Sequence, residues 1–185
     1  ASLNGIARRA GIAKSGVYNY FESREEIFLH LFLDDLEELV EWAVGALEPL
    51  KGSNNPGAVA AAMAKGFVDR PRFCELNTAL APVLEQNVSE ETVIEFKTAS
   101  LTEAMRLGLA VQEALPVVSF EPLAEAMSPL YALVGGLWPV ANPPPAVQAA
   151  LERPELELLR HDFETDLTRG IELILRGLVA EAAEQ

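Results

Sequence analysis

The sequence predicts an all-α protein in which a helix-turn-helix unit precedes a larger helical bundle. Two observations carry this prediction. Apolar residues recur at spacings of three and four along most of the 185 residues, which is the period of an amphipathic helix. Breaks rich in Pro and Gly separate these stretches, and no segment has the alternation typical of a β-hairpin. Half of the residues are apolar, so a chain of this length can bury a sizeable core.

The first element is predicted over residues 1–23 as two short helices joined by a tight turn. Ser2 can cap a helix over residues 3–10. Gly11 supplies the left-handed residue that ends a helix, and a second short helix is expected over residues 14–20. This order is typical of a helix-turn-helix, whose second helix enters the major groove of DNA.

The second predicted element is a long helix over residues 24–48. The run Ser23-Arg24-Glu25-Glu26 has the form of a capping box, which starts a helix. The acidic run over residues 34–38 is expected to be a solvated face. A stripe facing the core is expected from Ile27, Leu31, Leu36, Leu39, Trp42, Val44 and Leu47.

The remainder of the chain alternates between helical stretches and breaks. A loop is expected over residues 49–57, where Gly, Ser, Asn and Pro cluster. Pro129 should kink or split the helix that contains it, and the run Asn142-Pro143-Pro144-Pro145 is expected to be a rigid linker. Helices are predicted over residues 58–69, 71–87, 90–114, 120–139 and 155–182.

Two of these helices carry signals about packing. Residues 90–114, capped by Ser89, are apolar on several sides, which predicts a central helix with several neighbours. In the last helix, Gly170 and Gly177 lie on nearly the same side and would let another helix approach closely. Its apolar stripe is expected from Leu156, Leu159, Phe163, Leu167, Ile171, Ile174 and Leu178.

Charge is distributed unevenly. The formal net charge is −14, and a uniformly acidic surface would repel nucleic acid. Residues 1–24 nevertheless contain four basic residues and one acidic residue, and they form the only basic segment. A polyanionic partner is therefore expected at this end of the molecule.

The residues of this basic segment follow a specific pattern. Ile6-Ala7, Ala10-Gly11-Ile12 and Lys14 precede Tyr18-Asn19-Tyr20-Phe21, and Ser23-Arg24-Glu25-Glu26-Ile27 follows. In this pattern residues 2–32 resemble the TetR family of bacterial transcriptional regulators. That family has a further helix before the pattern, and we expect this chain to begin too late to contain it. Ser15-Gly16 also stands where the family often has Gly-Thr.

The resemblance implies how the chain is divided and assembled. Residues 1–23 would form a partial helix-turn-helix DNA-binding domain, and residues 24–185 a ligand-binding and dimerisation domain. The resemblance implies a cavity for a small-molecule effector, and a homodimer formed by the last two long helices. Two-fold symmetry also fits the physics, because one recognition helix contacts too few bases for a selective site.

Residues matching the family's DNA contacts follow from the same resemblance. Lys14 begins the recognition helix and can donate to guanine O6 or N7. The hydroxyls of Tyr18 and Tyr20 would reach phosphates, unless the two rings serve only in packing. Arg24 would add its charge to a helix start that faces phosphate. The expected DNA-binding residues are Asn4, Lys14, Ser15, Gly16, Tyr18, Asn19, Tyr20 and Arg24.

The helices that enclose the cavity in TetR-like proteins carry large apolar side chains in this sequence. Those expected to bind the ligand, unless they are ordinary core, are Trp42, Met63, Phe67, Phe73, Phe96, Met105 and Leu109. The candidate polar anchors are Asn77, Thr78, Thr102 and Arg106. A lining of this kind favours an apolar or aromatic effector over a sugar or nucleotide. Arg106 leaves open an anionic group on that effector.

Motifs of enzymatic chemistry are missing from the sequence. It contains no Gly-rich phosphate loop, nucleophile elbow or HExxH motif, so we predict no enzyme, no cofactor and no metal site. The single Cys74 excludes an internal disulfide, suits a reducing cytoplasm and is most simply a core residue. No run of 18 apolar residues occurs, which argues against a membrane span and favours a cytoplasmic protein.

Three functions are weighed on these grounds. The leading hypothesis is a ligand-responsive repressor that binds a palindromic operator as a homodimer and is released by its effector. The alternative is a ligand-binding helical protein whose helix-turn-helix no longer binds DNA, because Gly16 offers no side chain for base contact. The third is a helical-bundle enzyme, for which the sequence offers no catalytic residues.

Overall fold

The computed structural model describes residue 11, residues 21–80 and residues 86–184, and this part of the chain contains helices and no strand. The helices are α3 (Arg24–Leu47), η1 (Glu48–Leu50), α4 (Pro56–Val68), α5 (Pro71–Ala79), α6 (Glu90–Ala114), α7 (Phe120–Ala141), α8 (Pro145–Leu151), η3 (Pro154–Leu159) and α9 (Phe163–Ala183). The predicted all-α class is confirmed. The helices expected over residues 3–10 and 14–20 lie outside the described residues, but Gly11 between them has the expected left-handed φ of +69°.

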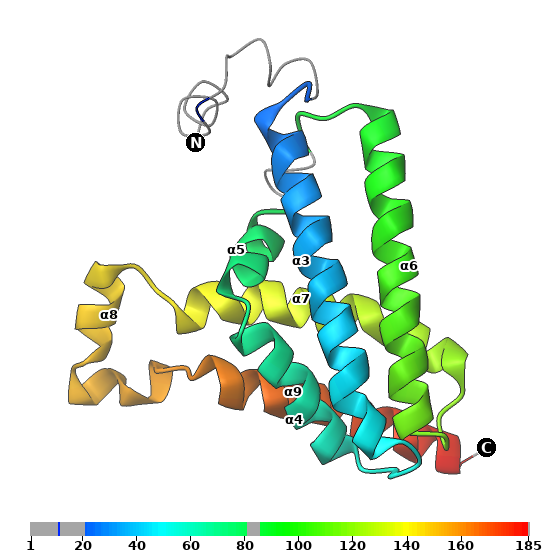
Figure 1. Ribbon diagram of the computed structural model, residues 1–185. Helices are drawn as coiled ribbons and strands as arrows, with labels where there is room; N and C mark the ends of the chain where they lie inside the picture. The colour runs from blue at the N-terminus through cyan, green and yellow to red at the C-terminus, as the bar shows by residue number, and fades with distance from the viewer. Residues whose placement is uncertain (1–10, 12–20, 81–85, 185) are drawn as a thin grey trace.

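The helices form two groups that cross each other (Figure 1). The long helices α3 and α6 lie side by side, and α4 and α5 pack against another side of α3. The helices α7 and α9 run in opposite directions across this group, with α9 against α4 and α7 against α5 and α6. The short helix α8 projects from the body beyond the paired ends of α7 and α9.

The predicted capping box starts α3. The backbone N–H of Glu26 donates to Ser23 Oγ at 3.1 Å, which satisfies one of the free donors at the helix start. The Glu26 carboxylate in turn accepts the backbone N–H of Glu22 at 2.6 Å. These two bonds fix the residue at which the helix begins.

The buried face of α3 differs from the predicted stripe. Because α3 packs against α6 on one side and α4 and α5 on another, several predicted residues lie half-buried at the flanks. Of the predicted set, only Leu39 and Leu47 are fully buried. The acidic run is also not uniformly solvated, because Asp35 is only 6% exposed. The buried residues of α3 are Glu25, Leu29, Phe32, Asp35, Leu39, Val40, Ala43 and Leu47.

The C-terminal end of α3 is tied to the C-terminal end of α6. After η1, the backbone N–H of Gly52 donates to the carbonyl of Glu113 at 2.8 Å, and that of Asn54 donates to Ala114 at 3.0 Å. Lys51 Nζ lies 2.6 Å from a carboxylate oxygen of Glu48 and 3.1 Å from one of Glu113. The segment that follows α3 and η1 is therefore joined to the C-terminal end of α6 by backbone and side-chain bonds.

The helix α6 was predicted to be surrounded by other helices, but one of its sides is exposed. Ser89 caps the helix as expected, accepting the N–H of Thr92 at 3.2 Å. The buried face is formed by Phe96, Gly108, Ala110, Val111 and Ala114. Ile94 and Leu109 are 58% and 50% exposed, and Leu101 and Met105, which border the cavity described below, are 61% and 46% exposed, so α6 lies at an edge of the bundle.

The predicted break at Pro129 does not split its helix. The helix α7 continues through both Pro129 and Pro139. A proline removes the hydrogen bond to the carbonyl four residues earlier, which here is that of Glu125. Both Glu125 and Pro129 are exposed, so water can hydrate the carbonyl that loses its partner.

The helix predicted over residues 155–182 is shorter and is preceded by a helical hairpin. The helix α8 already begins at Pro145, where the sequence predicted only a linker. The stretch that contains Leu156 and Leu159 belongs to η3 and lies outside the stripe of α9. The last helix begins after Asp162, whose Oδ1 accepts the N–H of Thr165 at 2.9 Å. The buried stripe of α9 is Phe163, Leu167, Ile171 and Leu175.

The helix predicted over residues 71–87 ends earlier in the part that is described. It runs from Pro71 to Ala79, and residues 86–88 are not helical. Residues 81–85 lie outside the described residues. Phe73 of α5 lies at the centre of the core, where its ring centroid is 4.8 Å from that of Phe32. The ring centroid of Phe96, from α6, is 5.6 Å from that of Phe32.

Candidate ligand-binding site

A cavity of about 410 Å³ lies between α3, α4, α5, α6 and α7. Its size is within the range of small-molecule sites, which is about 300–1,000 Å³. The lining is almost entirely apolar. The lining residues are Phe32, Leu36, Leu39, Val40, Met63, Phe67, Phe73, Leu80, Phe96, Lys97, Ser100, Leu101, Ala104, Met105, Leu107, Ala124, Met127, Ser128, Leu130 and Tyr131.

One wall of the cavity is formed by the middle of α3. Phe32, Leu36, Leu39 and Val40 lie three or four residues apart, so they share one face of the helix. A molecule in the cavity would contact this face over more than two helical turns. These four residues were not among the predicted ligand-binding residues, although their spacing is visible in the sequence.

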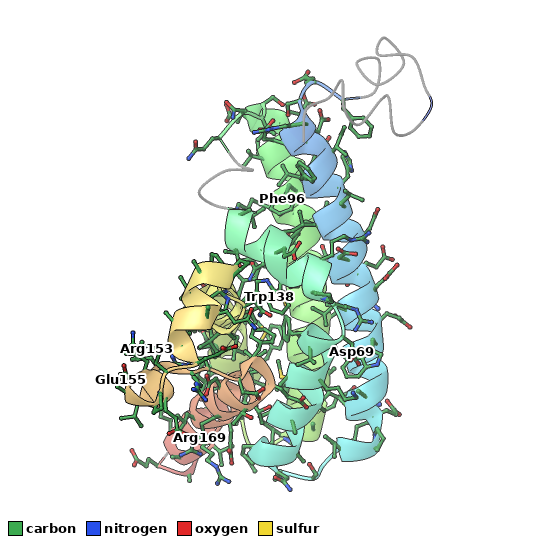
Figure 2. All side chains as sticks on the ribbon, turned by 90° about the vertical axis from the view of Figure 1, so that its left-hand side faces the viewer. Asp69, Phe96, Trp138, Arg153, Glu155 and Arg169 are labelled. Carbon is green, nitrogen blue, oxygen red and sulfur yellow. The ribbon has the colours of Figure 1, made fainter. Side chains whose placement is uncertain are left out.

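Five predicted residues meet at the cavity. They are Met63, Phe67, Phe73, Phe96 and Met105. Phe67 and Phe73 lie with ring centroids 5.9 Å apart, and Phe96 lies in the half of the body from which α3 begins (Figure 2). Large aromatic and methionine side chains of this kind form adaptable apolar walls.

Two predicted apolar residues lie elsewhere. Trp42 packs against Gly66 of α4, where a Cβ in place of the glycine hydrogen would lie 2.7 Å from its ring, and the guanidinium of Arg70 lies 5.5 Å from its ring centroid. Leu109 is 50% exposed on the outer side of α6. Both residues were predicted to line the pocket because their side chains are large and apolar. Trp42 instead packs between helices, and Leu109 lies on the surface.

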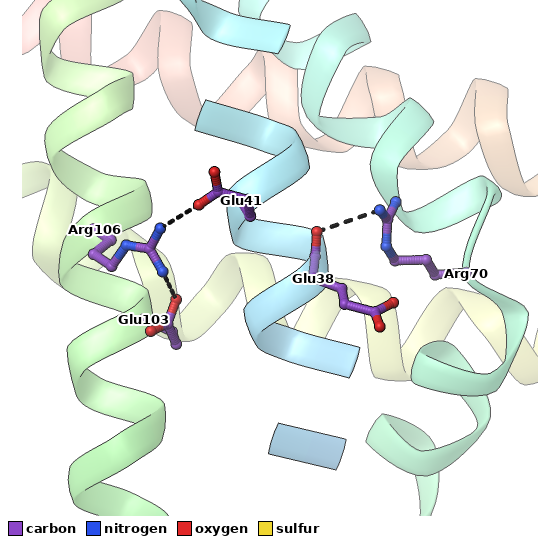
Figure 3. Close-up of polar contacts among 5 residues, drawn as sticks. All are labelled: Glu38, Glu41, Arg70, Glu103 and Arg106. Atoms are coloured by element: carbon purple, nitrogen blue, oxygen red, sulfur yellow. Dashed lines mark hydrogen bonds and ion pairs between the residues drawn. The ribbon is translucent and has the colours of Figure 1, made fainter. Parts of the chain in front are cut away.

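The predicted polar anchors also lie outside the cavity lining. Arg106 Nη2 pairs with Glu41 of α3 and Nη1 with Glu103, both at 2.7 Å (Figure 3). The hydrogen bond that Arg106 donates to Glu41, together with the charge of Glu103, raises the pKa of Arg106 above its ordinary value. Nearby, Arg70 donates to the carbonyl of Glu38 at 3.3 Å, so polar contacts fix α3 to α6 and α4 outside the cavity.

The three remaining anchors make contacts within and between helices. Thr102 Oγ1 donates to the carbonyl of Thr98 at 3.0 Å and its residue is exposed. Thr78 Oγ1 donates to the carbonyl of Cys74 at 2.9 Å. Asn77 is buried and its Nδ2 donates to the carbonyl of Tyr131 at 3.2 Å, which joins α5 to α7.

Polar groups that the sequence reasoning missed do line the cavity. Lys97 and Ser100 contribute from α6, and Ser128 and Tyr131 from α7. Ser100 Oγ is buried and has no hydrogen-bond partner among the described residues. The spacing of Phe96, Ser100 and Leu107 on the inner side of α6 is the signal that would have indicated this face.

Of the eight predicted DNA-binding residues, only Arg24 lies in the described part of the chain. It is exposed at the start of α3, and its Nε donates to Glu25 Oε1 at 2.6 Å. Asn4, Lys14, Ser15, Gly16, Tyr18, Asn19 and Tyr20 lie outside the described residues. Their roles therefore remain predictions.

Other chemistry has no support among the described residues. No group of three or more His, Cys, Asp or Glu side chains there could hold a metal ion. Cys74 is fully buried and its Sγ contacts the carbonyl of Phe67 at 3.5 Å. Within the same residues, none of the helices is both long and apolar enough to span a bilayer.

A long helix that leads from a predicted helix-turn-helix into the wall of an apolar cavity defines a class of ligand-responsive DNA-binding regulators. Comparison with protein families supports this class over most of the chain. Residues 33–182 match the Tetracyclin repressor-like C-terminal domain, and residues 1–31 match the bacterial regulatory proteins of the tetR family. The chain belongs to the TetR family. No curated protein matches the chain.

Family membership confirms the resemblance found in the sequence. It makes this chain a ligand-responsive, DNA-binding transcriptional regulator in the general sense of its family. Proteins of the family are in general regulators rather than enzymes.

Proposed function

We propose that the protein is a repressor that binds a palindromic operator as a homodimer in the cytoplasm and is released by an apolar or aromatic effector. The observation that carries this proposal is the shared use of α3. The helix begins directly after the helix-turn-helix segment, and its residues Phe32, Leu36, Leu39 and Val40 line the cavity.

The switch follows from differential binding. An effector changes the position of α3 only if it binds one position of this helix better than another. Packed helices have discrete arrangements, so contacts along Phe32 and Leu36 can favour one of them. Release of DNA results when that arrangement no longer places both recognition helices on the operator.

The dimer is expected to form through α7 and α9. Residues 126–151 contain no charged side chain, and Pro129, Tyr131, Ala132, Gly136 and Val140 are exposed on α7. An exposed face with so little charge resembles the core of a protein interface. On α9, Gly177 is exposed, and none of the described residues lies within 4 Å of where its Cβ would be.

The test combines DNA binding with ligand screening on the full-length protein. The DNA upstream of its gene is the probe in an electrophoretic mobility assay. Apolar and aromatic compounds are screened for thermal stabilisation of the protein. The proposal expects a specific complex that at least one stabilising compound dissociates. If stabilising compounds do not release DNA, the proposed switch is wrong. If only sugars or nucleotides stabilise the protein, the proposed apolar effector site is wrong.

The second candidate is a ligand-binding helical protein that no longer uses its helix-turn-helix for DNA. Gly16 favours it, because glycine lowers helix propensity and offers no side chain at a recognition position. This candidate expects ligand binding at the cavity with no sequence-specific DNA complex. The same mobility assay separates the two functions.

A further inference from the structure

We propose that the effector is an apolar carboxylate, whose carboxylate group binds Lys97 and Ser100 of α6 while its apolar part fills the cavity between α3, α4, α5, α6 and α7. The inference rests on the proposed function, because it takes the cavity as the effector site. It adds the charge of the ligand and the two side chains that recognise it.

The first argument is the charge of the lining. The chain carries 28 acidic residues and only 14 Lys and Arg residues. Among the described residues that line the cavity, however, Lys97 is the single charged one, and no Asp or Glu occurs. A cavity with one cation and no anion favours a ligand with a single negative charge.

The second argument is an unused hydroxyl. Ser100 Oγ is buried, lines this cavity and has no partner among the described residues. A buried polar atom without a partner is costly, and most such atoms in native proteins are satisfied by a ligand, water or protein group. A carboxylate oxygen would accept the hydrogen bond that this hydroxyl can donate.

The third argument is the placement of the two groups. Lys97 and Ser100 lie three residues apart on α6, so their side chains share one face of the helix. The Lys97 ammonium lies 5.7 Å from the ring centroid of Phe96, which is itself a lining residue. The Lys97 residue is exposed and Ser100 Oγ is buried, so we place the carboxylate at the open side of the cavity, with one oxygen on Lys97 and the other on Ser100. Ser128 of α7 adds a further hydroxyl to the lining.

The rest of the lining determines that the remaining part of the ligand is apolar. Phe32, Phe73 and Met63 are buried and offer no hydrogen bonds to a polyhydroxylated molecule. An apolar cavity cannot satisfy the many polar groups of a sugar, which would lose their hydration. The ligand class that fits is an alkyl or aromatic carboxylic acid, ionised near pH 7.

The experiment compares head groups on one tail. Binding of decanoate, decanol and decylamine to the full-length protein is measured by titration calorimetry near neutral pH. We expect decanoate to bind about tenfold more tightly than decanol, because only the carboxylate makes a charge-assisted hydrogen bond with Lys97. Decylamine should bind most weakly. Lys97→Met should remove the preference for decanoate and leave the affinity for decanol unchanged.

Three further variants make the result specific. Ser100→Ala should lower the affinity for decanoate several-fold. Lys65→Met, which removes an exposed cation outside the cavity, is the control and should leave all three affinities unchanged. Ala104→Phe should lower the affinity of every probe, because Ala104 lines the cavity and a larger side chain would fill it. Thermal unfolding of each variant establishes that it is folded.

The outcomes separate this inference from the function on which it rests. Equal affinity for the three head groups, reduced together by Ala104→Phe, would overturn the carboxylate and keep the apolar effector site. A preference for decanoate that survives Lys97→Met would overturn the role of this lysine. Binding that Ala104→Phe does not change would show that the cavity is not the site, and the proposed effector site would fail with it.

Discussion

Arg72, in the first turn of α5, donates from Nε and Nη2 to both carboxylate oxygens of Asp35 on α3, with an Nε–Oδ2 distance of 2.8 Å. The pair is asymmetric. The side chain of Asp35 is 8% exposed, whereas that of Arg72 is 62% exposed. Because Asp35 lies between the cavity residues Phe32 and Leu36, this contact fixes the helix that forms the cavity wall.

Removing Arg72 alone should therefore be more harmful than removing both members of this pair. Arg72→Met strands a buried carboxylate and should lower the free energy of unfolding by about 1–2 kcal/mol, a value reduced by the exposure of the arginine. The double variant with Asp35→Ala should be more stable than Arg72→Met alone. Urea unfolding measures both. Lys65→Met, from the exposed pair with Asp69, serves as the control and should change little. Additive losses in the double variant would contradict this account.

Two glycines should respond in opposite ways to alanine. At Gly66 a Cβ would lie 2.7 Å from Trp42 Cζ3 and 2.9 Å from Leu39 Cδ1, so Gly66→Ala should cost about 1–3 kcal/mol by overpacking. At Gly45, in the last turns of α3, no described residue lies within 4 Å of where a Cβ would be, and Gly45→Ala should stabilise the helix by about 0.5–1 kcal/mol. Thermal unfolding measures the difference, and equal shifts in Tm would refute the close approach of α4 to α3.

The two glycines of α9 separate folding from assembly. A Cβ at Gly170 would lie 2.5 Å from Leu133 Cδ2 of α7, so Gly170→Ala should disturb the packing within one subunit. Gly177 is open, and Gly177→Leu should leave the subunit folded while shifting a homodimer towards monomer. Sedimentation velocity at micromolar concentration measures this shift. A parent protein that is already monomeric there would refute the proposed dimer.

Cys74 should be chemically inert in the native protein. Burial, together with the charge of Glu75, raises the pKa of the Cys74 thiol to about 12. The thiolate is the reactive form, so the thiol should remain protonated and unreactive towards a disulfide reagent between about pH 7 and 9. Reaction should begin only after unfolding in denaturant. Rapid labelling of the folded protein would contradict the core position of Cys74.

DNA binding should depend on Arg24 and Lys14 in different ways. Arg24→Ala should weaken binding of the full-length protein to all sequences and reduce the slope of its salt dependence by about one. Lys14→Ala should change the discrimination between operator variants, because a base contact contributes about 1–3 kcal/mol. Salt-dependent mobility or anisotropy measurements distinguish the two. Unchanged operator affinity in both variants would show that the expected roles are wrong.

Sequence patterns predicted the helical class and several helix starts well. The caps at Ser23 and Ser89 were recognised because capping depends on a few adjacent residues. Capping is local chemistry, which one sequence contains. Met63, Phe73 and Phe96 were indicated as cavity residues by the resemblance to the TetR family together with their large apolar side chains.

The predictions that failed depend on contacts between distant residues. Asp35 could not be identified as buried, because its partner Arg72 lies 37 residues further along the chain. Arg106 was expected near the cavity, but Glu41 and Glu103 hold it outside. Leu156 continues the spacing of the last stripe, and only the cap at Asp162 shows that the helix begins later.

The bonds that join the segment after α3 to the C-terminal end of α6 set the geometry of any rotation of this helix. With a pivot near Leu47, the cavity residue Leu36 lies 11 residues from the pivot and Arg24 lies 23 residues from it. At a rise of about 1.5 Å per residue, these arms measure about 16 Å and about 34 Å. Under the proposed switch, each ångström of rotation at Leu36 would carry Arg24 through about two, and the contacts that hold Asp35, Glu38 and Glu41 would have to yield for α3 to turn.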